Sequence, residues 1–389
     1  VAIAAGNANA PTFVWPPLQA QLLGLSFWLF GTTLVPIQVL QVIFLVASGF
    51  LLRSIARQIG LSESASNLCL FAFVTYPSLV AFSHYLWPEV PHLFFALLAV
   101  RALFAGGGTN ALIAGASLGV GLLFKSLLMP FLPIFVCVAA RPLHNGRWRP
   151  STAALLIAGL AVTAGPVVVG NGMGHGYWGI SSSGAFNAWV GLSDRSRRNF
   201  VDSGVHDAMT VYLDSSSDAR ERERLVTAQV FEKVGTDGIL LTVRRQAGKQ
   251  FHRLLDKDSF FTDQLPDGIR PRYAGIGAVS TWLYRNLTYA VYVGLLIAAV
   301  CGMTVPVPAT VRRRMFPFLI FLVGNLAIFS ILHVKTRYRI QMLPPLFLYA
   351  AVAWDFLVGH LRDRAWGRSR IAIAALGTSM ITWLALGPK

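Results

Sequence analysis

The sequence predicts an all-helical protein that crosses a membrane many times, and three observations support this fold class. Of the 389 residues, 54% are hydrophobic and only 13% are charged, whereas an average globular domain has about 25% charged residues. The mean hydropathy is +0.57. Apolar runs of about 17 to 25 residues, the length that crosses a bilayer as a helix, recur along most of the chain. We therefore expect a polytopic transmembrane bundle with about ten spans.

The apolar runs divide the chain into three parts. They fall at 33–53, 64–83, 88–105, 109–125, 126–141, 151–171, 285–305, 316–334, 340–360 and 370–387. A shorter apolar stretch at 17–30 follows two prolines, which favours an interfacial helix over a span. We expect an N-terminal transmembrane module at 1–171, an exported loop subdomain at 172–284 and a C-terminal transmembrane module at 285–389.

The arginines of the short loops predict the orientation of the bundle. They form five groups: Arg53 with Arg57, Arg101, Arg141 with Arg147 and Arg149, Arg312 to Arg314, and Arg362 to Arg370. Ten spans place all five groups on one face, which the positive-inside rule makes cytoplasmic. The net charge of +16 then reflects topology and anionic lipids, so we expect no nucleic-acid partner.

The exported loop is expected to be helical. Ser217, followed by Asp218 and Glu221, is typical of a helix N-cap with an acidic first turn. A second helix is predicted from Asp237 to Leu255. The loop is polar enough either to fold as a small subdomain or to lie on the membrane.

The beginning of the sequence predicts a longer natural protein. Val1 is not an initiator methionine, and residues 1–14 lack the basic and apolar regions of a signal peptide. We expect at least one further span upstream, which would give eleven or more.

A basic cluster marks the candidate site. His333, Lys335, Arg337 and Arg339 lie between two apolar runs, on the face opposite to the other arginine groups. Bulk lipid headgroups would account for these charges, and so would a bound anionic ligand. Lys125, on the same face, either snorkels to the water or joins the cluster around a phosphate.

Glu89 is the only carboxylate that we find at the exported ends of the spans before the long loop. An ionisable group at membrane depth is functional by default. Glu89 could be a solvated loop residue, a contact for a substrate hydroxyl, a metal ligand or a general base. His84, Glu89 and His92 could converge on a divalent cation such as Mg²⁺ or Mn²⁺, although their spacing fits no standard metal motif.

Aromatic side chains near the exported face have two interpretations. Tyr85, Trp87, Trp189 and Trp282 are typical of the aromatic belt at a membrane surface. The same rings would also stack on a sugar or an isoprenoid.

The order of these motifs resembles the GT-C superfamily of membrane glycosyltransferases. It runs from Trp15-Pro-Pro-Leu18 through the Glu89 loop and Gly121-Leu-Leu-Phe-Lys125 to Arg337-Tyr338-Arg339 and its following Ile-Gln-Met-Leu-Pro. Asn187-Ala-Trp189-Val-Gly191 in the loop adds to the similarity. The chain looks most like family 39, which includes protein O-mannosyltransferases and the lipid A aminoarabinose transferase. The similarity covers nearly the whole chain through loose motifs, and the first span would be missing.

The resemblance implies transfer of a sugar from a polyprenyl-phosphate donor to a lipid, protein or glycan acceptor, with inversion at the anomeric carbon. It implies a bacterial inner membrane and a site that faces the periplasm or cell exterior. Glu89 would be the supporting acid, because the family's catalytic Asp precedes the Pro-Pro-Leu motif and residues 1–14 contain no acid. We expect substrate contacts from one set of residues: His84, Lys125, Trp189, His333, Lys335, Arg337, Tyr338 and Arg339.

Two other classes compete with this interpretation. A transporter or flippase for a lipid-linked anion would also place cations in a membrane cavity, but it predicts inverted repeats, which the sequence lacks. A non-catalytic binder of a lipid-linked phosphate would need no catalytic Asp.

Overall fold

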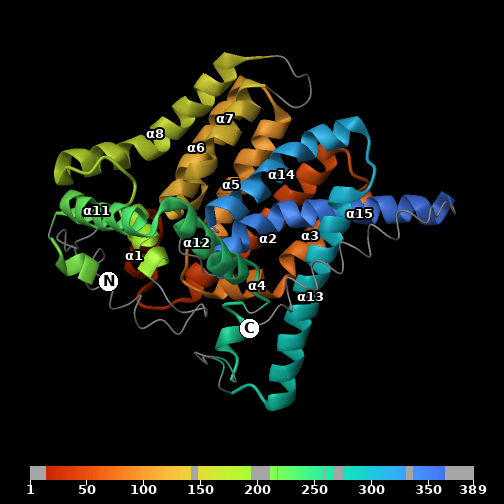
Figure 1. Cartoon of the computed structure of the whole chain (residues 1–389). Helices are drawn as coiled ribbons and strands as arrows, with labels where there is room; N and C mark the ends of the chain where they lie inside the picture. The colour runs from red at the N-terminus through yellow and green to blue at the C-terminus, as the bar shows by residue number, and fades with distance from the viewer. Residues whose placement is uncertain are drawn as a thin grey trace.

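The computed structural model describes residues 15–141, 148–193, 211–216, 218–257, 259–266, 268, 273, 275–329 and 336–363. Every regular element in these ranges is a helix, which confirms the all-α fold class (Figure 1). Within the described ranges, four segments are long and apolar enough to cross a membrane. They are α2 (Val35–Ile59), α8 (Pro150–His175), α13 (Ala278–Thr304) and the segment Thr336–Gly359.

One bent helix pair is either a fifth, broken span or a re-entrant loop. Helices α3 (Glu63–Val74) and α4 (Pro77–His84) pass the same test together, with a bend of 48° between them. Pro77 is the first residue of α4. A proline has no amide hydrogen and restricts the preceding residue to extended backbone, and Tyr76 is indeed extended. The prediction of a span at 64–83 therefore corresponds to a bent helix pair.

The other predicted spans are short, interrupted or outside the described residues. Helices α5 (Glu89–Ala105) and α6 (Gly108–Phe124) have 17 residues each, which is the lower end of the range of about 17 to 25 residues that crosses a bilayer. The run 126–141 is a 3-10 turn, η1 (Ser126–Phe131), followed by the short α7 (Leu132–Ala140). Helix α14 (Ala309–Phe329) has its apolar part only after Arg314. The run 370–387 lies outside the described residues, so the number of about ten spans remains a prediction.

The remaining elements flank this bundle. Helix α1 (Leu18–Phe30) precedes α2, as expected for the stretch at 17–30. The 3-10 turn η3 (Thr336–Met342) leads directly into α15 (Leu343–Asp363). The long loop contains α9 (Ser183–Ser193), α11 (Ala219–Asp237), α12 (Ile239–Leu255) and the turn η2 (Thr262–Gln264).

The loop helices largely follow the sequence prediction, with two differences. Helix α11 is capped by Asp218, whose carboxylate accepts from the backbone N–H of Arg220, while Ser217 lies outside the described residues. Helix α12 begins at Ile239 instead of Asp237, because Gly238 has a φ of 79° and separates the two helices. The loop has a small core of its own, made of Phe186, Val190, Tyr212 and Val226.

Glycines allow close contact between the helices of the bundle. A Cβ at Gly115 of α6 would lie 1.9 Å from the Leu156 carbonyl oxygen of α8, and one at Gly302 of α13 would lie 1.8 Å from the Tyr349 carbonyl oxygen of α15. Such approaches are typical of membrane helices, where small residues let backbones touch. Figure 1 shows α8, α6 and α5 lying in succession. The main core runs through both transmembrane modules and also includes Leu254 and Phe260 of the loop.

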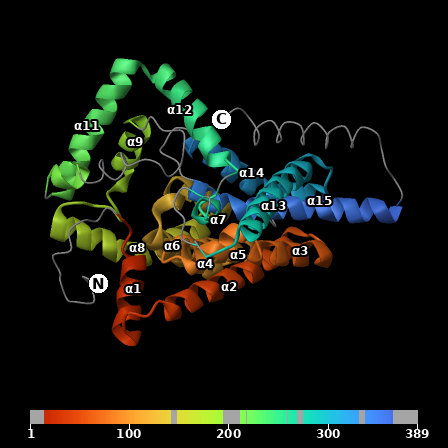
Figure 2. The same cartoon turned by 90° about the horizontal axis from the view of Figure 1, so that it is seen from below.

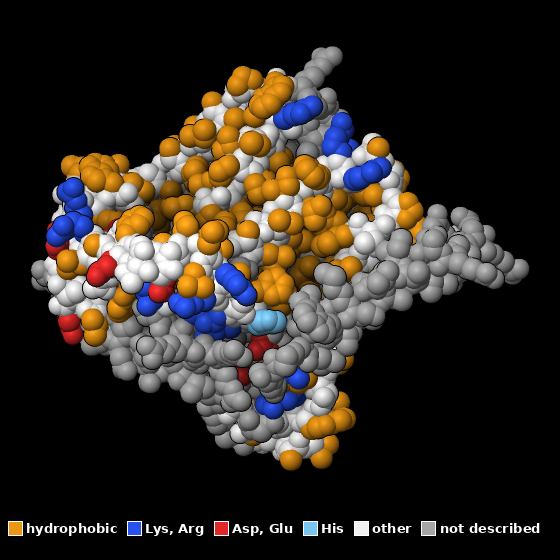
Figure 3. All heavy atoms as spheres, viewed as in Figure 1, with side chains coloured by type: hydrophobic (Ala, Val, Ile, Leu, Met, Phe, Trp, Pro, Cys, Tyr) orange, Lys and Arg blue, Asp and Glu red, His pale blue; other side chains and the backbone are white. Residues whose placement is uncertain are grey.

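The outer surface of the bundle is apolar. Large hydrophobic side chains are exposed on α8 and α14, among them Val162, Val169, Phe316 and Val323. Figure 3 shows these hydrophobic side chains spread over one face, with Lys and Arg toward its borders. An exposed apolar surface of this kind is typical of contact with lipid.

Two glycines of α8 test the helix packing as a matched pair. A Cβ at Gly159 would lie 2.2 Å from the Leu112 carbonyl oxygen, whereas one at Gly165 meets nothing within 4 Å. We expect Gly159→Ala to lower the free energy of unfolding by about 1–3 kcal/mol through overpacking. Gly165→Ala should leave it unchanged or raise it slightly. Thermal unfolding of the purified variants in detergent measures both; equal loss in the two variants would contradict the packing.

Candidate functional site

Three chain segments meet at the candidate site, each at a point where a helix begins or ends. Glu89 is the first residue of α5, directly after Pro88. A carboxylate is favoured there by the positive end of the helix dipole. Lys125 lies between α6 and η1 with extended backbone, which interrupts the helix. Arg337 comes from η3, just before α15. These segments are far apart in the sequence, and the fold brings their side chains together.

Glu89 forms the centre of the cluster. The Lys125 ammonium donates to Glu89 Oε1 at 2.5 Å, and Arg337 Nε lies 3.9 Å from the same oxygen. The Glu89 side chain is 1% exposed, against 13% for Lys125 and 21% for Arg337. The other carboxylate oxygen, Oε2, is buried and has no hydrogen-bond partner among the described residues.

The charges of this cluster do not balance. One carboxylate lies between two cations, so the group carries one net positive charge in a site with little access to solvent. Burying a charge is costly unless it is paired. An anion that entered the site would remove this excess and gain two charge-assisted contacts. The arrangement is therefore suited to binding a phosphate or carboxylate group.

Aromatic rings support both cations. The Arg337 guanidinium lies 4.6 Å from the centre of the Trp87 ring and 5.7 Å from that of Tyr338, and the Lys125 ammonium lies 5.2 Å from the Tyr338 ring. Contacts of this kind stabilise a cation where water is scarce. The sequence suggested Trp87 only as a membrane anchor or a stacking residue. Its position two residues before Glu89 was the available signal for a role at the site.

His92 holds the end of α6 in place. Its Nδ1 donates to the Gly121 carbonyl oxygen at 2.9 Å, and the backbone N–H of Lys125 donates to the same oxygen at 3.0 Å. His92 is fully buried. His92 lies one turn after Glu89 on α5. Its hydrogen bond to Gly121 therefore connects α5 to the last turn of α6, which ends just before Lys125.

The other predicted site residues lie elsewhere. His84 is exposed, and its Nδ1 is 2.9 Å from the Val80 carbonyl oxygen of its own helix. Trp189 packs beside Phe186 in the small loop core. His333 and Lys335 lie outside the described residues.

Arg339 is directed toward the loop. Its guanidinium donates to the Asp256 carbonyl oxygen and lies 4.1 Å from the centre of the Tyr292 ring. The Tyr292 hydroxyl in turn donates to the Leu255 carbonyl oxygen at 3.1 Å. These contacts hold the end of α12 on α13 and η3, so we assign Arg339 a structural role.

The predicted convergence of His84, Glu89 and His92 on a metal ion does not match the described contacts. His84 is directed to Val80 and His92 Nδ1 to Gly121. Among the described residues, no three His, Cys, Asp or Glu side chains lie close enough together to hold a metal. A divalent cation bound with the substrate remains a prediction.

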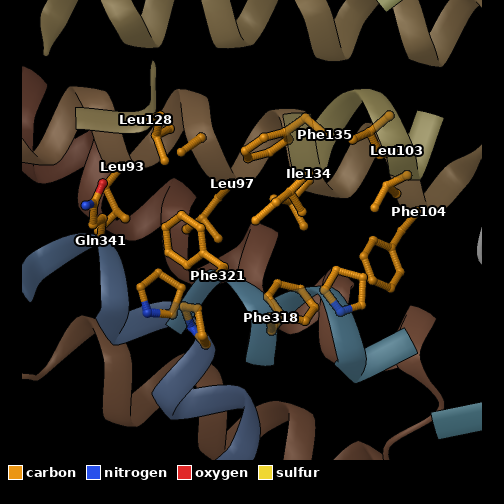
Figure 4. A pocket seen from close by; sticks show the side chains of 16 residues that line it. Leu93, Leu97, Leu103, Phe104, Leu128, Ile134, Phe135, Phe318, Phe321 and Gln341 are labelled. Carbon is orange, nitrogen blue, oxygen red and sulfur yellow. The ribbon is translucent and has the colours of Figure 1, made fainter. Parts of the chain in front are cut away.

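An apolar cavity adjoins the charged cluster. It has a volume of about 80 Å³ and lies between α5, α7, α14 and the start of α15. Figure 4 shows Leu93, Leu128 and Gln341 toward one end and Phe104 toward the other. Leu93, Leu128 and Gln341 follow Glu89, Lys125 and Arg337 by three or four residues, so the segments that carry the cluster also line this end of the cavity. Gln341 Nε2 donates to Asn325 Oδ1 at 2.6 Å, and Gln341 Oε1 has no partner among the described residues.

A second, wider groove lies between α3, α13 and α15. Its volume is about 480 Å³, and its lining includes Tyr76, Leu295 and Phe347. The Tyr76 hydroxyl is buried without a hydrogen-bond partner among the described residues. This groove is a second candidate for an apolar ligand among the helices that the structure describes.

The stability of the charged cluster can be tested by a double-mutant cycle. Removing one partner of a buried ion pair costs about 3–5 kcal/mol, and Glu89→Gln would leave two cations facing each other. We expect Glu89→Gln to destabilise the protein by about 3 kcal/mol and Lys125→Met to cost less, because Arg337 remains. The double variant should recover part of the loss. Unfolding in detergent measures all three.

The exposed ion pair between Glu221 and Arg224, at 2.8 Å, is the control for this cycle. Glu221→Gln should leave the free energy of unfolding nearly unchanged, because exposed ion pairs contribute little. A Glu89→Gln variant as stable as Glu221→Gln would show that the buried pair does not hold the segments together.

Comparisons of the chain with protein-family models, with curated proteins and with solved structures find no match. The functional interpretation therefore depends on the geometry of the site and on the physical chemistry of its residues.

Proposed function

We propose that the chain is a membrane glycosyltransferase that takes a sugar from a polyprenyl-phosphate donor and transfers it to an acceptor at the outer face of the membrane. The observation that carries this proposal is the cluster of Glu89, Lys125 and Arg337 beside an apolar cavity. A lipid-linked phosphate has the two parts that such a site requires, because it joins an anionic head to an apolar chain. Lys125 offers a point charge and Arg337 a planar fork to the phosphate.

The positions of the charges support an outer-face site. Glu89 and Lys125 lie at the start of α5 and the end of α6, while Arg101 and Arg53 lie toward the opposite ends of α5 and α2. If the second group faces the cytoplasm, the site faces the exterior, which is the periplasm in the proposed bacterial inner membrane. The proposal includes the bundle of about ten spans and the three-part domain division, and it keeps His333 and Lys335 as predicted substrate contacts.

The proposed reaction is an inverting substitution at the anomeric carbon. The acceptor hydroxyl oxygen forms a bond to this carbon, and the bond from the carbon to the phosphate oxygen breaks, with its electron pair moving to the phosphate. The hydroxyl proton passes to a carboxylate base. Lys125 and Arg337 stabilise the negative charge that develops on the leaving phosphate in a poorly hydrated site.

Glu89 has a supporting role in this mechanism. Its Oε1 is bonded to Lys125, and it holds both cations where the phosphate would enter. Glu89 is not assigned as the base, because its Oε1 already accepts from Lys125. Glu89 Oε2, which has no described partner, is available to a substrate hydroxyl.

One observation favours a second function, that of a non-catalytic binder of a lipid-linked phosphate. Glu89 is the carboxylate that the described contacts place in the cluster, and it is already engaged with Lys125. Such a protein would bind the donor lipid and leave its sugar unchanged.

Arg337 provides the direct test of the phosphate role. In nanodiscs, we expect Arg337→Gln to weaken binding of a polyprenyl phosphate and to slow sugar transfer about 10- to 100-fold, the equivalent of a charge-assisted contact of about 1.5–3 kcal/mol. Native mass spectrometry measures binding, and transfer of a radiolabelled sugar measures turnover. Arg57→Gln, at the opposite end of the bundle, is the control.

The outcomes separate the two functions. Unchanged binding and turnover in Arg337→Gln would remove its phosphate role. Binding that depends on Arg337, without transfer of any polyprenyl-linked sugar, would favour the non-catalytic binder.

The cavity beside the site can be tested by filling it. Ala96 lines this cavity and Ala72 lines the wider groove, and both are partly buried. We expect Ala96→Phe to raise the Kd for a long polyprenyl phosphate about tenfold, equal to about 1.4 kcal/mol, and to leave the Kd for a short-chain phosphate unchanged. Ala72→Phe is the matched control. The opposite result would place the chain in the wider groove.

A further inference from the structure

Helix α12 has an inverted distribution of polar and apolar side chains. Its buried side chains are polar over most of its length: Thr242, Gln246, Gln250 and Arg253 are each 7% exposed or less, with Leu254 joining them at the end. A helix on the surface of a water-soluble domain normally buries its apolar face. Exposure to water alone therefore does not explain why the apolar side chains of α12 face outward.

Hydrogen bonds fix this orientation. Gln246 Nε2 and Lys249 Nζ both donate to the Gly191 carbonyl oxygen of α9, at 2.7 and 2.8 Å. Gln250 Nε2 donates to Gln246 Oε1 at 3.3 Å. The polar face is thus bonded to the protein, and α12 could not rotate to bury its apolar residues without breaking these bonds.

Large apolar side chains are exposed at the corner where α11 meets α12. Leu240 is 84% exposed, Ile239 68% and Phe231 of α11 70%, and Leu241 and Val243 are also exposed. Figure 2 shows this corner, which we call the α11–α12 corner (Phe231 to Val243), extending away from the bundle. Several exposed large apolar side chains at one corner indicate an interaction surface.

The charges of α12 indicate the chemistry of the partner. The helix carries Arg244, Arg245, Lys249 and Arg253, and it contains no Asp or Glu. Arg244 and Arg245 are exposed within five residues of Leu240, and Arg245 contacts only the neighbouring Asp237 among the described ion pairs, at 3.5 Å. Apolar side chains with adjacent arginines are typical of helices that lie in the headgroup layer of an anionic membrane. Two copies of this basic helix would repel each other in a symmetric contact.

We infer that the α11–α12 corner lies in the surface of the bilayer, with Ile239 and Leu240 at the boundary of the acyl chains and Arg244 and Arg245 among anionic headgroups. The other end of α12 is held by Tyr292 and by Arg339 of η3. Insertion of the corner would therefore hold the loop in a fixed position beside the segment that carries Arg337.

The depth of the corner can be measured with a nitroxide label. We would place the label at Leu240→Cys, and in a control at the exposed Gln229→Cys, in full-length protein with Cys69, Cys137 and Cys301 replaced by alanine. The protein is reconstituted in phosphatidylcholine with added phosphatidylglycerol. We expect the label at 240 to collide with lipid-soluble oxygen more than with an aqueous nickel complex, and the label at 229 to show the reverse.

The role of the arginines is tested in vesicles of phosphatidylcholine alone. Position 240 should become more accessible to the nickel complex there, and Arg244→Gln with Arg245→Gln should remove the difference between the two lipid mixtures. If the cysteine-free protein does not fold, hydrogen exchange of peptides from 231–245 in the natural-cysteine protein gives the same comparison, with slower exchange expected in the anionic nanodiscs.

Two results would overturn the inference. The first is a label at 240 that is fully accessible to the nickel complex in both lipid mixtures. The second is a label at 240 that is immobilised and lies within spin-coupling distance of a label on another copy, which would show that a second chain covers the corner.

Discussion

The buried Glu89 carboxylate, held between the Lys125 ammonium and the Arg337 guanidinium, is the interaction on which the site depends. Glu89 is 1% exposed, so its charge is stable only while both cations remain within reach. The three residues come from the start of α5, the break after α6 and the turn η3. Glu89 therefore attracts side chains from three helix ends that are distant in the sequence, and the cluster carries the net positive charge that an anionic ligand would neutralise.

Interruptions of the helices make this cluster possible. Where a helix begins, ends or breaks, a side chain leaves the regular helical repeat, so charges from different segments can meet at one point. Lys125 lies in extended backbone at the end of α6, and η3 precedes α15 as a separate 3-10 turn. His92 supports the first interruption through the Gly121 carbonyl oxygen, and Trp87 and Tyr338 cover the cations. Backbone irregularity at membrane depth is tolerated where it lines a buried site or cavity.

The loop and the bundle are connected at the same place. Arg339, two residues after Arg337, reaches the end of α12 instead of the charged cluster, and Tyr292 of α13 holds the adjacent carbonyl. A short stretch of η3 thus serves two purposes, one in the site and one in anchoring the loop. The inverted polarity of α12 then follows from its position, because one side is bonded to α9 and the other side extends beyond the protein.

The all-helical class and the positions of most helices were predictable from the sequence, and so was the choice of Glu89, Lys125 and Arg337 as candidate site residues. These features depend on local quantities, namely hydrophobic run length and the cost of placing an isolated charge in an apolar run. The partners of those charges were not predictable. Arg337 and Arg339 are separated by one residue in the sequence. Arg337 nevertheless lies near Glu89 and Arg339 contacts Asp256, because η3 directs the two side chains to different neighbours. His84 and Trp189 carry chemistry suited to a site, but the folding of α4 and α9 places them against other groups. Contacts between segments that are distant in the chain depend on how the helices pack. Local patterns in a single sequence do not reveal this packing.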